Sequence, residues 1–283
     1  MNFVSEIESS CITNKIKKEI HKPIFVTGLA RSGTSIILNA LNQHNETGSF
    51  LYKDLPFIDT PYFWNVLSNF FYYRVGKKKR LHGDEIYIEP NSPEAFEEII
   101  WKKYLHQYLS ANSQLINKKY SNLKFETKLK ETINKVLYVR GLKKRYLSKG
   151  NYNITRIEYI LKLFPTSKII LCIRDPIEHI NSLVRVHKRF LKISLKEKYL
   201  NEQLNILGHF EFGANRRPIC INKENYKKTI KYWNLSKNFE GYSLQWYDIY
   251  KMVYRNYLLK KINNNILIID NNVSLSFLSN FSS

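Results

Sequence analysis

The chain has few cysteines and no long apolar run. Its three cysteines, Cys11, Cys172 and Cys220, follow neither the spacing of a disulfide framework nor that of a zinc site. No stretch approaches the roughly 18 consecutive apolar residues that a membrane-spanning helix needs. Glu6 and Glu8 lie where a secretion signal would have its apolar core. We therefore expect a cytoplasmic protein without a membrane span and without a metal site.

Acidic residues are also scarce. The chain carries 24 Asp and Glu against 45 Lys and Arg, a formal net charge of +21. Such an excess suits an anionic partner, namely a phosphorylated cofactor, an acidic polysaccharide or a nucleic acid. Lys77-Lys78-Lys79-Arg80 is the only basic run of four, so much of the charge is equally consistent with solvated faces. No recognised nucleic-acid module is present, and we expect no nucleic-acid partner.

Strand and helix patterns alternate along the chain. At 283 residues with 43% hydrophobic content, the chain predicts one α/β domain over residues 1–283, with 1–21 as a polar lead-in. Ile24 to Thr27 reads as a buried strand, followed by a helix from Thr34 to about His44. Residues 50–90 look aromatic and irregular. This alternation predicts three layers, with a mostly parallel sheet flanked by helices.

Further elements follow in the second half of the chain. Ser92-Pro93 has the form of a helix start. A strand is expected at Arg145 to Ser148. Lys168 to Ile173 is the clearest buried strand, and Asp175-Pro176 after it predicts the N-terminus of another helix. A last strand is expected at Ile266 to Ile269.

The first strand runs into the segment Gly28-Leu29-Ala30-Arg31-Ser32-Gly33-Thr34-Ser35. Its spacing is that of a phosphate-binding loop in which Thr34 takes the place of the lysine and Arg31 supplies a cation instead. Backbone N–H groups and the positive end of the helix dipole would face an anion here. The sequence therefore predicts a bound phosphate, held without the usual nucleoside-triphosphatase lysine.

Arg174 follows the clearest buried strand and would lie at the same sheet edge as the loop. Its planar fork suits a phosphate, and Ser182 lies eight positions further along, about two turns into the next helix. The alternative is that Arg174 and Asp175 form only a helix cap and a surface ion pair. A nucleotide with phosphates at both ends of its ribose would use two such sites.

These motifs resemble those of the sulfotransferases that use 3′-phosphoadenosine 5′-phosphosulfate (PAPS). The resemblance extends from about Pro23 to Trp246. It implies a P-loop-like sulfotransferase fold, PAPS as the cofactor and no required metal. The residues that it assigns to the cofactor are Gly28, Arg31, Ser32, Gly33, Thr34, Ser35, Arg174 and Ser182.

The resemblance also suggests catalytic residues. Arg31 would stabilise the leaving phosphate. Lys149, at the separation seen in tyrosyl-protein members of the family, would contact the sulfuryl oxygens, although an ordinary exposed lysine is an equal alternative. Asp54 is our candidate for the general base. Its rivals are His82, Asp84 and Glu97. Arg216-Arg217 could add phosphate or acceptor contacts, or form a solvated basic turn.

We therefore expect transfer of a sulfuryl group to a hydroxyl or amine acceptor, with a carbohydrate, lipid-linked or small molecule preferred over a protein. Two alternatives remain open. One is a P-loop kinase or nucleotide hydrolase, which would need a Mg²⁺ carboxylate. The other is a non-catalytic anion-binding relative. The chain ends at Ser283, soon after the last expected strand, so its C-terminal part is short relative to the family.

Overall fold

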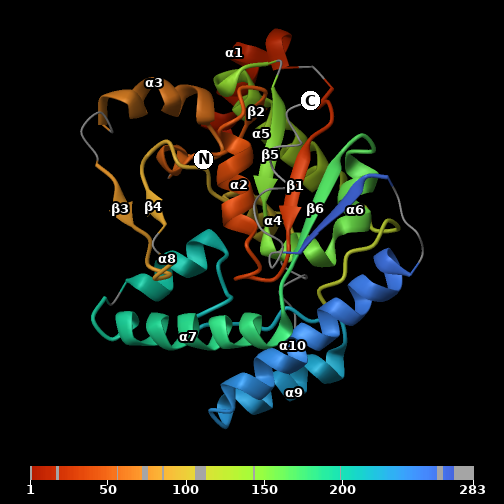
Figure 1. Cartoon of the computed structure of the whole chain (residues 1–283). Helices are drawn as coiled ribbons and strands as arrows, with labels where there is room; N and C mark the ends of the chain where they lie inside the picture. The colour runs from red at the N-terminus through yellow and green to blue at the C-terminus, as the bar shows by residue number, and fades with distance from the viewer. Residues whose placement is uncertain are drawn as a thin grey trace.

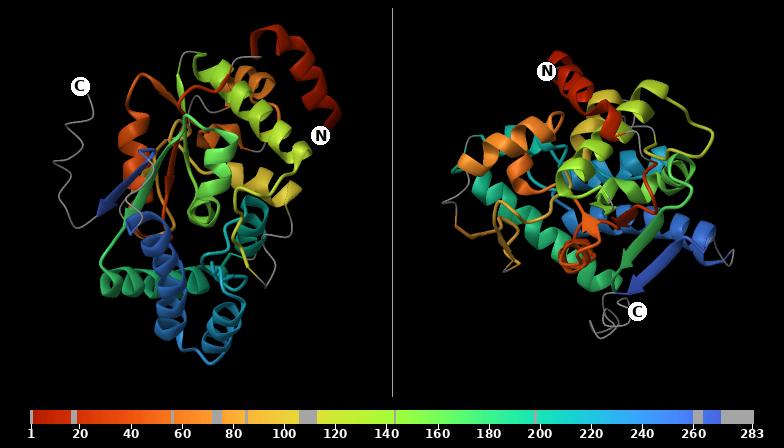
Figure 2. Two further views of the ribbon diagram at one scale, coloured as in Figure 1. Left: turned by 90° about the vertical axis from the view of Figure 1, so that its right-hand side faces the viewer. Right: turned by 90° about the horizontal axis from the view of Figure 1, so that it is seen from above.

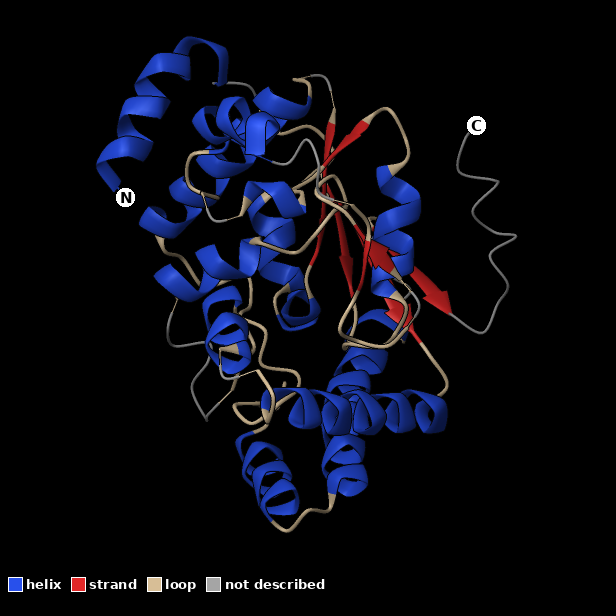
Figure 3. Ribbon diagram, turned by 90° about the vertical axis from the view of Figure 1, so that its left-hand side faces the viewer, coloured by secondary structure: helices blue, strands red, loops and turns tan. Residues whose placement is uncertain are grey.

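The computed structural model describes residues 2–16, 19–55, 57–71, 76–84, 86–105, 113–142, 144–197, 199–259 and 264–270. Within these ranges, five parallel strands form the central sheet in the order β2-β5-β1-β6-β7 (Figures 1 and 3). The strands are β1 (Ile24–Thr27), β2 (Thr47–Gly48), β5 (Arg145–Lys149), β6 (Lys168–Ile173) and β7 (Ile266–Asp270). The register pairs Ile24 with both Leu147 and Lys168, so β1 lies at the centre of the sheet.

Side chains alternate along each strand and thereby divide the core into two layers. Ile24 and Val26 of β1 pack with Ile37 and Leu38 of α2 (Thr34–Asn42) on one face. Phe25, between them in the sequence, belongs to the larger cluster on the other face. That cluster includes residues of α5 (Leu123–Arg140) and α6 (Ile157–Leu163). The expected α/β fold with a parallel sheet flanked by helices is therefore confirmed.

The helices that follow β6 in the chain lie beyond the C-terminal ends of the strands (Figure 1). They are α7 (Pro176–Ser194), α8 (Leu200–Leu207), α9 (Lys223–Asn234) and α10 (Asn238–Val253), which continues into the π-helical turn η4 (Tyr254–Leu258). The start of α7 is as predicted: Asp175 Oδ1 accepts a hydrogen bond of 2.9 Å from the Glu178 amide, and Pro176 is the first helical residue.

The N-terminal segment is more ordered than its sequence indicates. Residues expected as a polar lead-in form α1 (Asn2–Ile16), which lies beside α5 in both views of Figure 2. Ser5, Glu8 and Ile12 form its buried side. Lys135 of α5 is fully buried and donates 2.9 Å to the Ser5 carbonyl, with Glu8 3.4 Å away. Because two of the three buried side chains are polar, the sequence has no apolar periodicity that would predict this helix.

Residues 50–90 are also less irregular than expected. They contain the 3₁₀ turn η1 (Tyr52–Asp54), the helix α3 (Pro61–Phe71) and an antiparallel hairpin of β3 (Lys78–Lys79) and β4 (Tyr87–Ile88). The helix expected from Ser92 begins later, as α4 (Glu97–Tyr104). Ser92 instead accepts a hydrogen bond of 3.0 Å from the Glu89 amide and closes a turn. The segment 271–283, which we expected to be a short tail, lies outside the described residues.

Candidate functional site

A cavity of about 330 Å³ opens at the C-terminal edge of the sheet. Three neighbouring strands deliver residues to it: the loop after β1 contributes Arg31 and Gly33 to Ser35, β5 ends at Lys149, and Arg174 follows β6. Because parallel strands end at a common edge, segments more than 100 residues apart meet here. The sequence prediction that the loop and Arg174 share one edge is borne out by this geometry.

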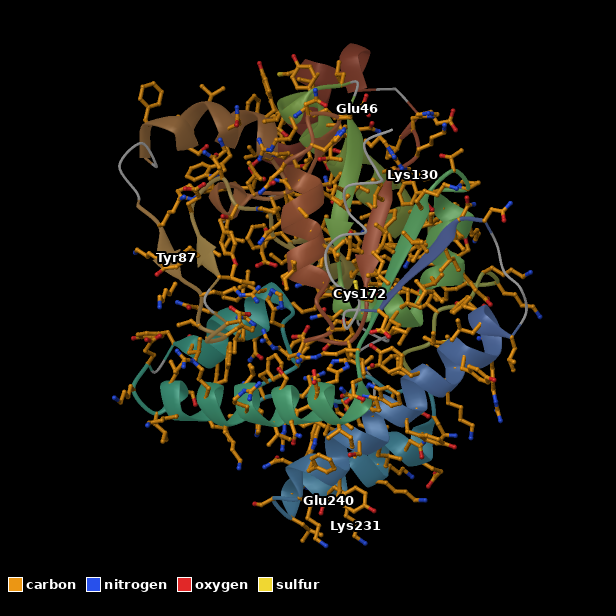
Figure 4. All side chains as sticks on the ribbon, viewed as in Figure 1. Glu46, Tyr87, Lys130, Cys172, Lys231 and Glu240 are labelled. Carbon is orange, nitrogen blue, oxygen red and sulfur yellow. The ribbon has the colours of Figure 1, made fainter. Side chains whose placement is uncertain are left out.

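The glycine loop passes closely over the end of β6. A Cβ atom at Gly28 would lie only 2.4 Å from Ser32 Oγ and 2.6 Å from the Cys172 carbonyl oxygen. Figure 4 labels Cys172 toward the lower end of the sheet. No side chain fits at Gly28, and its φ of +153° also favours glycine. Gly28 therefore permits the close approach that sets the loop beside Arg174.

Fewer residues of the loop have amides available to an anion than the sequence suggests. Ser32 is fully buried, and its amide donates 3.1 Å to the Leu29 carbonyl within the loop. Gly33 has φ +96° and is the N-cap of α2, so the amides of Thr34 and Ser35 begin the helix. The first N–H groups of a helix have no intrahelical acceptor and lie at its positive end. An anion would therefore be bound by Gly33 to Ser35, with Ser32 shaping the turn.

Two arginines share one carboxylate beside the loop. Arg31 Nη1 lies 2.6 Å from Asp84 Oδ2, and Arg80 contacts the same oxygen. Arg80 also donates 3.0 Å to Ser35 Oγ. Burial favours the neutral acid, but hydrogen bonds from both arginines outweigh it and hold the pKa of Asp84 well below its usual range. The loop is thus lined by two guanidinium groups that a carboxylate holds in place.

Arg174 and Ser182 do not lie in equivalent positions. Arg174 lines the cavity, and its Nη2 donates 2.9 Å to Glu178 one turn along α7. Ser182 is fully buried, and its hydroxyl accepts a 3.2 Å hydrogen bond from Arg31 Nε. The structure therefore brings Arg174 to the cavity and places Ser182 behind the Arg31 side chain. His179 attaches α7 to the loop through a 2.8 Å hydrogen bond with the Ala30 carbonyl.

Lys149 and Glu94 form the deeper, polar end of the cavity. Lys149 is 8% exposed, and its Nζ lies 3.8 Å from Glu94 Oε1. The Tyr52 hydroxyl donates 2.5 Å to the other oxygen of Glu94. Burial opposes ionisation of Glu94, but the charges of Lys149 and His209 and the bond from Tyr52 lower its pKa to about 2. Glu94 is therefore an ionised carboxylate that holds the Lys149 ammonium at the cavity.

A histidine and a second carboxylate complete this end. His209 Nδ1 lies 3.8 Å from Glu211 Oε2, and Asn151 donates 2.6 Å to the other oxygen of Glu211. Burial alone would lower the pKa of His209, but Glu211 and Glu94 outweigh it and raise that pKa above its ordinary value. The two carboxylates therefore make His209 a stronger base than an ordinary imidazole.

The predicted base lies elsewhere. Asp54 is 1% exposed, accepts 2.7 Å from the Leu51 amide and is 2.5 Å from Arg140 Nη2. It is absent from the cavity wall. A carboxylate engaged in this way holds η1 against α5 rather than facing the cavity. Arg216, another candidate contact, stacks 4.0 Å from the Trp233 ring centroid and is also away from the cavity wall.

The rivals to Asp54 differ in position. Glu97 lies outside the cavity wall and accepts a hydrogen bond from Tyr146, and burial raises its pKa to about 7. His82 lines the cavity with its ring 5.1 Å from that of Phe190, and burial lowers its pKa to about 3. Asp84 is committed to the two arginines. None of the three combines access to the cavity with basicity near neutral pH.

The cavity is also lined by Arg80, Glu94, His209 and Glu211, to which the sequence prediction assigned no role. Arg80 belongs to the only basic run of four, for which no specific contact was predicted. Glu94, His209 and Glu211 lie in segments far from the loop in sequence, and no local pattern shows that they meet. Among the described residues no group of three or more His, Cys, Asp or Glu could hold a metal ion. Of the helices described, none has the length and apolarity to cross a bilayer.

A family model described as the sulfotransferase family matches residues 23–216. The structure is similar to sulfotransferase STF1 from Mycobacterium tuberculosis H37Rv at 10% identity and a TM-score of 0.45, covering 89% of this chain and 76% of that one. It is similar to STF9 from Mycobacterium avium at 11% identity and a TM-score of 0.42, covering 88% and 73%. A search of curated proteins gives no match.

Proposed function

The chain belongs to the sulfotransferase family, and from this premise we propose that it transfers a sulfuryl group from PAPS to an acceptor hydroxyl. The observation that carries the proposal is the convergence of the glycine loop and Arg174 on one cavity. The strands before them are direct neighbours, with Thr27 paired to Leu171. One nucleotide with a phosphate group on each side of its ribose would use both sites.

The residues present suit such a donor. The amides of Gly33 to Ser35 and the guanidinium of Arg80 offer hydrogen bonds to a 5′-phosphosulfate, and Gly28 leaves the loop free of a side chain where it meets β6. Arg174 offers a planar fork to a 3′-phosphate. Ser182 would join it only after Arg31 leaves its hydroxyl. Arg31 also pairs with Asp84. If Arg31 moves, the Asp84 carboxylate keeps its ion pair with Arg80.

PAPS supplies a sulfuryl group on a good leaving phosphate, and the protein positions the reactants and neutralises charge. Bound PAPS would supply the sulfuryl group, which would pass from the 5′-phosphate oxygen to the acceptor oxygen. Arg31 and Arg80 would stabilise the charge that grows on the leaving phosphate, and Lys149 would contact the sulfuryl oxygens. His209 Nε2 would take the acceptor proton. The products are a sulfate ester and 3′-phosphoadenosine 5′-phosphate (PAP), and the scheme needs no metal.

His209 takes the base role in place of Asp54. It lines the cavity, and neighbouring carboxylates raise its pKa, which strengthens the imidazole as a proton acceptor. Glu211 near Nδ1 would favour the tautomer that leaves Nε2 unprotonated. Localisation in the reducing cytoplasm also belongs to the proposal, and the unpaired state of Cys11, Cys172 and Cys220 supports it.

Calorimetric titration with PAP and with ADP tests the donor assignment. We expect PAP to bind more tightly than ADP without added Mg²⁺, since only PAP carries a 3′-phosphate. Incubation with ³⁵S-labelled PAPS and an acceptor should then give a labelled ester. Equal affinity for the two nucleotides, or Mg²⁺-dependent turnover of ATP, would favour the kinase or nucleotide hydrolase alternative. PAP binding without transfer to any acceptor would favour a non-catalytic anion-binding relative.

A further inference from the structure

The cavity has one wall of a different character from its polar end. Leu200, Leu204 and Leu207 lie at positions i, i+4 and i+7 of α8, so they share one face of the helix, and all three line the cavity. The neighbouring Ile206 points away and is 63% exposed. Helix α8 therefore presents an apolar stripe to the cavity and a different face to solvent.

The β3–β4 hairpin supplies apolar residues to the same cavity. Ile86 and Ile88 stand two residues apart, as side chains on one face of an extended segment do, and both line the cavity. Tyr87 between them is 53% exposed and is labelled on β4 in Figure 4. Leu81, in the turn between the strands, adds to this wall. Helix α8 and the β3–β4 hairpin thus both direct aliphatic side chains into the cavity.

We propose that the acceptor is a neutral amphipathic molecule, with an aliphatic or alicyclic body against Leu204 and Ile88 and a hydroxyl at the end formed by Lys149 and His209. This inference rests on the proposed function and specifies its substrate class. A free oligosaccharide would place hydroxyl groups against leucine and isoleucine without partners, at the cost of their hydrogen bonds to water. An apolar body gains by leaving water instead.

The charges at the polar end specify the head group of the acceptor. Glu94 and Glu211 both line the cavity. The Tyr52, Lys149, Asn151 and His209 contacts described above favour the ionised form of these two carboxylates. A carboxylate or phosphate on the acceptor would face them at short range and be repelled. A neutral hydroxyl meets no such repulsion and can donate its proton to His209.

The test compares n-octyl β-D-glucoside with methyl β-D-glucoside, which carry the same hydroxyl groups and differ only in the alkyl chain. Affinities are measured by calorimetry below the micelle concentration, with and without PAP. Burial of only two methylene groups accounts for roughly tenfold in affinity. We therefore expect the octyl compound to bind at least about tenfold more tightly, and to be the better acceptor of ³⁵S from PAPS. Equal affinities would overturn the proposal.

Two variants of α8 separate the cavity from nonspecific binding. Leu204→Asp should bring the octyl-to-methyl affinity ratio close to one, whereas Ile206→Asp on the exposed face should leave it unchanged. Should Leu204→Asp not fold, Ile88→Thr tests the hairpin wall in the same way. A ratio that neither Leu204→Asp nor Ile88→Thr lowers, or that Ile206→Asp lowers equally, would overturn the assignment of this wall.

A third ligand tests the neutrality of the head group. Octyl β-D-glucuronide, in which a carboxylate replaces the C6 hydroxymethyl group, should bind at least about tenfold more weakly than the octyl glucoside. Equal or tighter binding would refute that part of the inference. PAP titration of the same samples reports on the donor site separately. Loss of PAP binding with a retained chain-length preference would reject the proposed function, whereas PAP binding without that preference would reject only the acceptor class.

Discussion

Replacement of Arg174 by alanine tests how the donor is recognised. In the structure the Arg174 guanidinium lines the cavity and donates 2.9 Å to Glu178, whose side chain is 60% exposed. A hydrogen bond from arginine to a phosphate contributes about 1.5–3 kcal/mol. Binding of the 3′-phosphate gives up the exposed ion pair, which contributes about 0–1 kcal/mol. The difference, about 0.5–3 kcal/mol, corresponds to a roughly 2- to 160-fold loss of PAP affinity in Arg174→Ala.

The assay is calorimetric titration of PAP and of adenosine 5′-phosphosulfate, which lacks the 3′-phosphate. Arg174→Ala should weaken PAP by the stated factor and leave the second ligand within about twofold of wild type. Glu178→Gln is the matched control, because it frees Arg174 without removing it. That variant should bind PAP as well as wild type or up to about fivefold better. If Arg174→Ala weakens both ligands equally, Arg174 does not recognise the 3′-phosphate and the reasoning fails.

Three further predictions concern the base, the core and the loop. The rate should rise with pH through the pKa of His209, above the ordinary 6.5, because only neutral imidazole accepts a proton. Glu211→Gln removes a cause of that raised pKa, so the acid limb of a log kcat/KM profile should move to lower pH; an unmoved limb would exclude His209 as the base. Glu98→Ala removes the carboxylate 2.9 Å from the fully buried Arg156. Urea unfolding should show that the free energy of unfolding falls by about 3–5 kcal/mol. A decrease below about 1 kcal/mol would contradict this prediction. Gly28→Ala should lose about 1–3 kcal/mol by overpacking and weaken PAP binding, as measured by urea unfolding and calorimetry; wild-type values for both would contradict the loop geometry.

The sheet could be predicted because its signals are local. The strands at Ile24 to Thr27 and Lys168 to Ile173 are continuous apolar runs, as parallel strands buried on both faces require. The start of α7 could likewise be predicted from Asp175 and the proline that follows it. Helix α1 was not predicted, because its buried side depends on Ser5 and Glu8, whose partner Lys135 lies more than 120 residues away.

The site divides along the same line. The proposed donor side was predicted from one continuous segment, the glycine loop, and one strand end. The proposed acceptor side draws on Tyr52, Glu94, Lys149 and His209, from four segments whose meeting depends on the fold, and of these only Lys149 was a candidate from the sequence. Asp54 shows the limit of sequence separation as a guide. It lies near the loop in sequence, yet its carboxylate is taken by Arg140 at the end of α5.

The distribution of charge inside the cavity explains why a chain with net charge +21 places carboxylates there. A lysine close enough to stabilise sulfuryl oxygens also lowers the pKa of a neighbouring histidine, as Lys149 does for His209. A cavity lined only by cations would bind the donor but would leave the imidazole a weak base. Glu211 and Glu94 reverse that effect and raise the pKa of His209. Under the proposed function, the two carboxylates would therefore let one cavity stabilise an anionic donor and still remove a proton from the acceptor, a balance that formal net charge does not reveal.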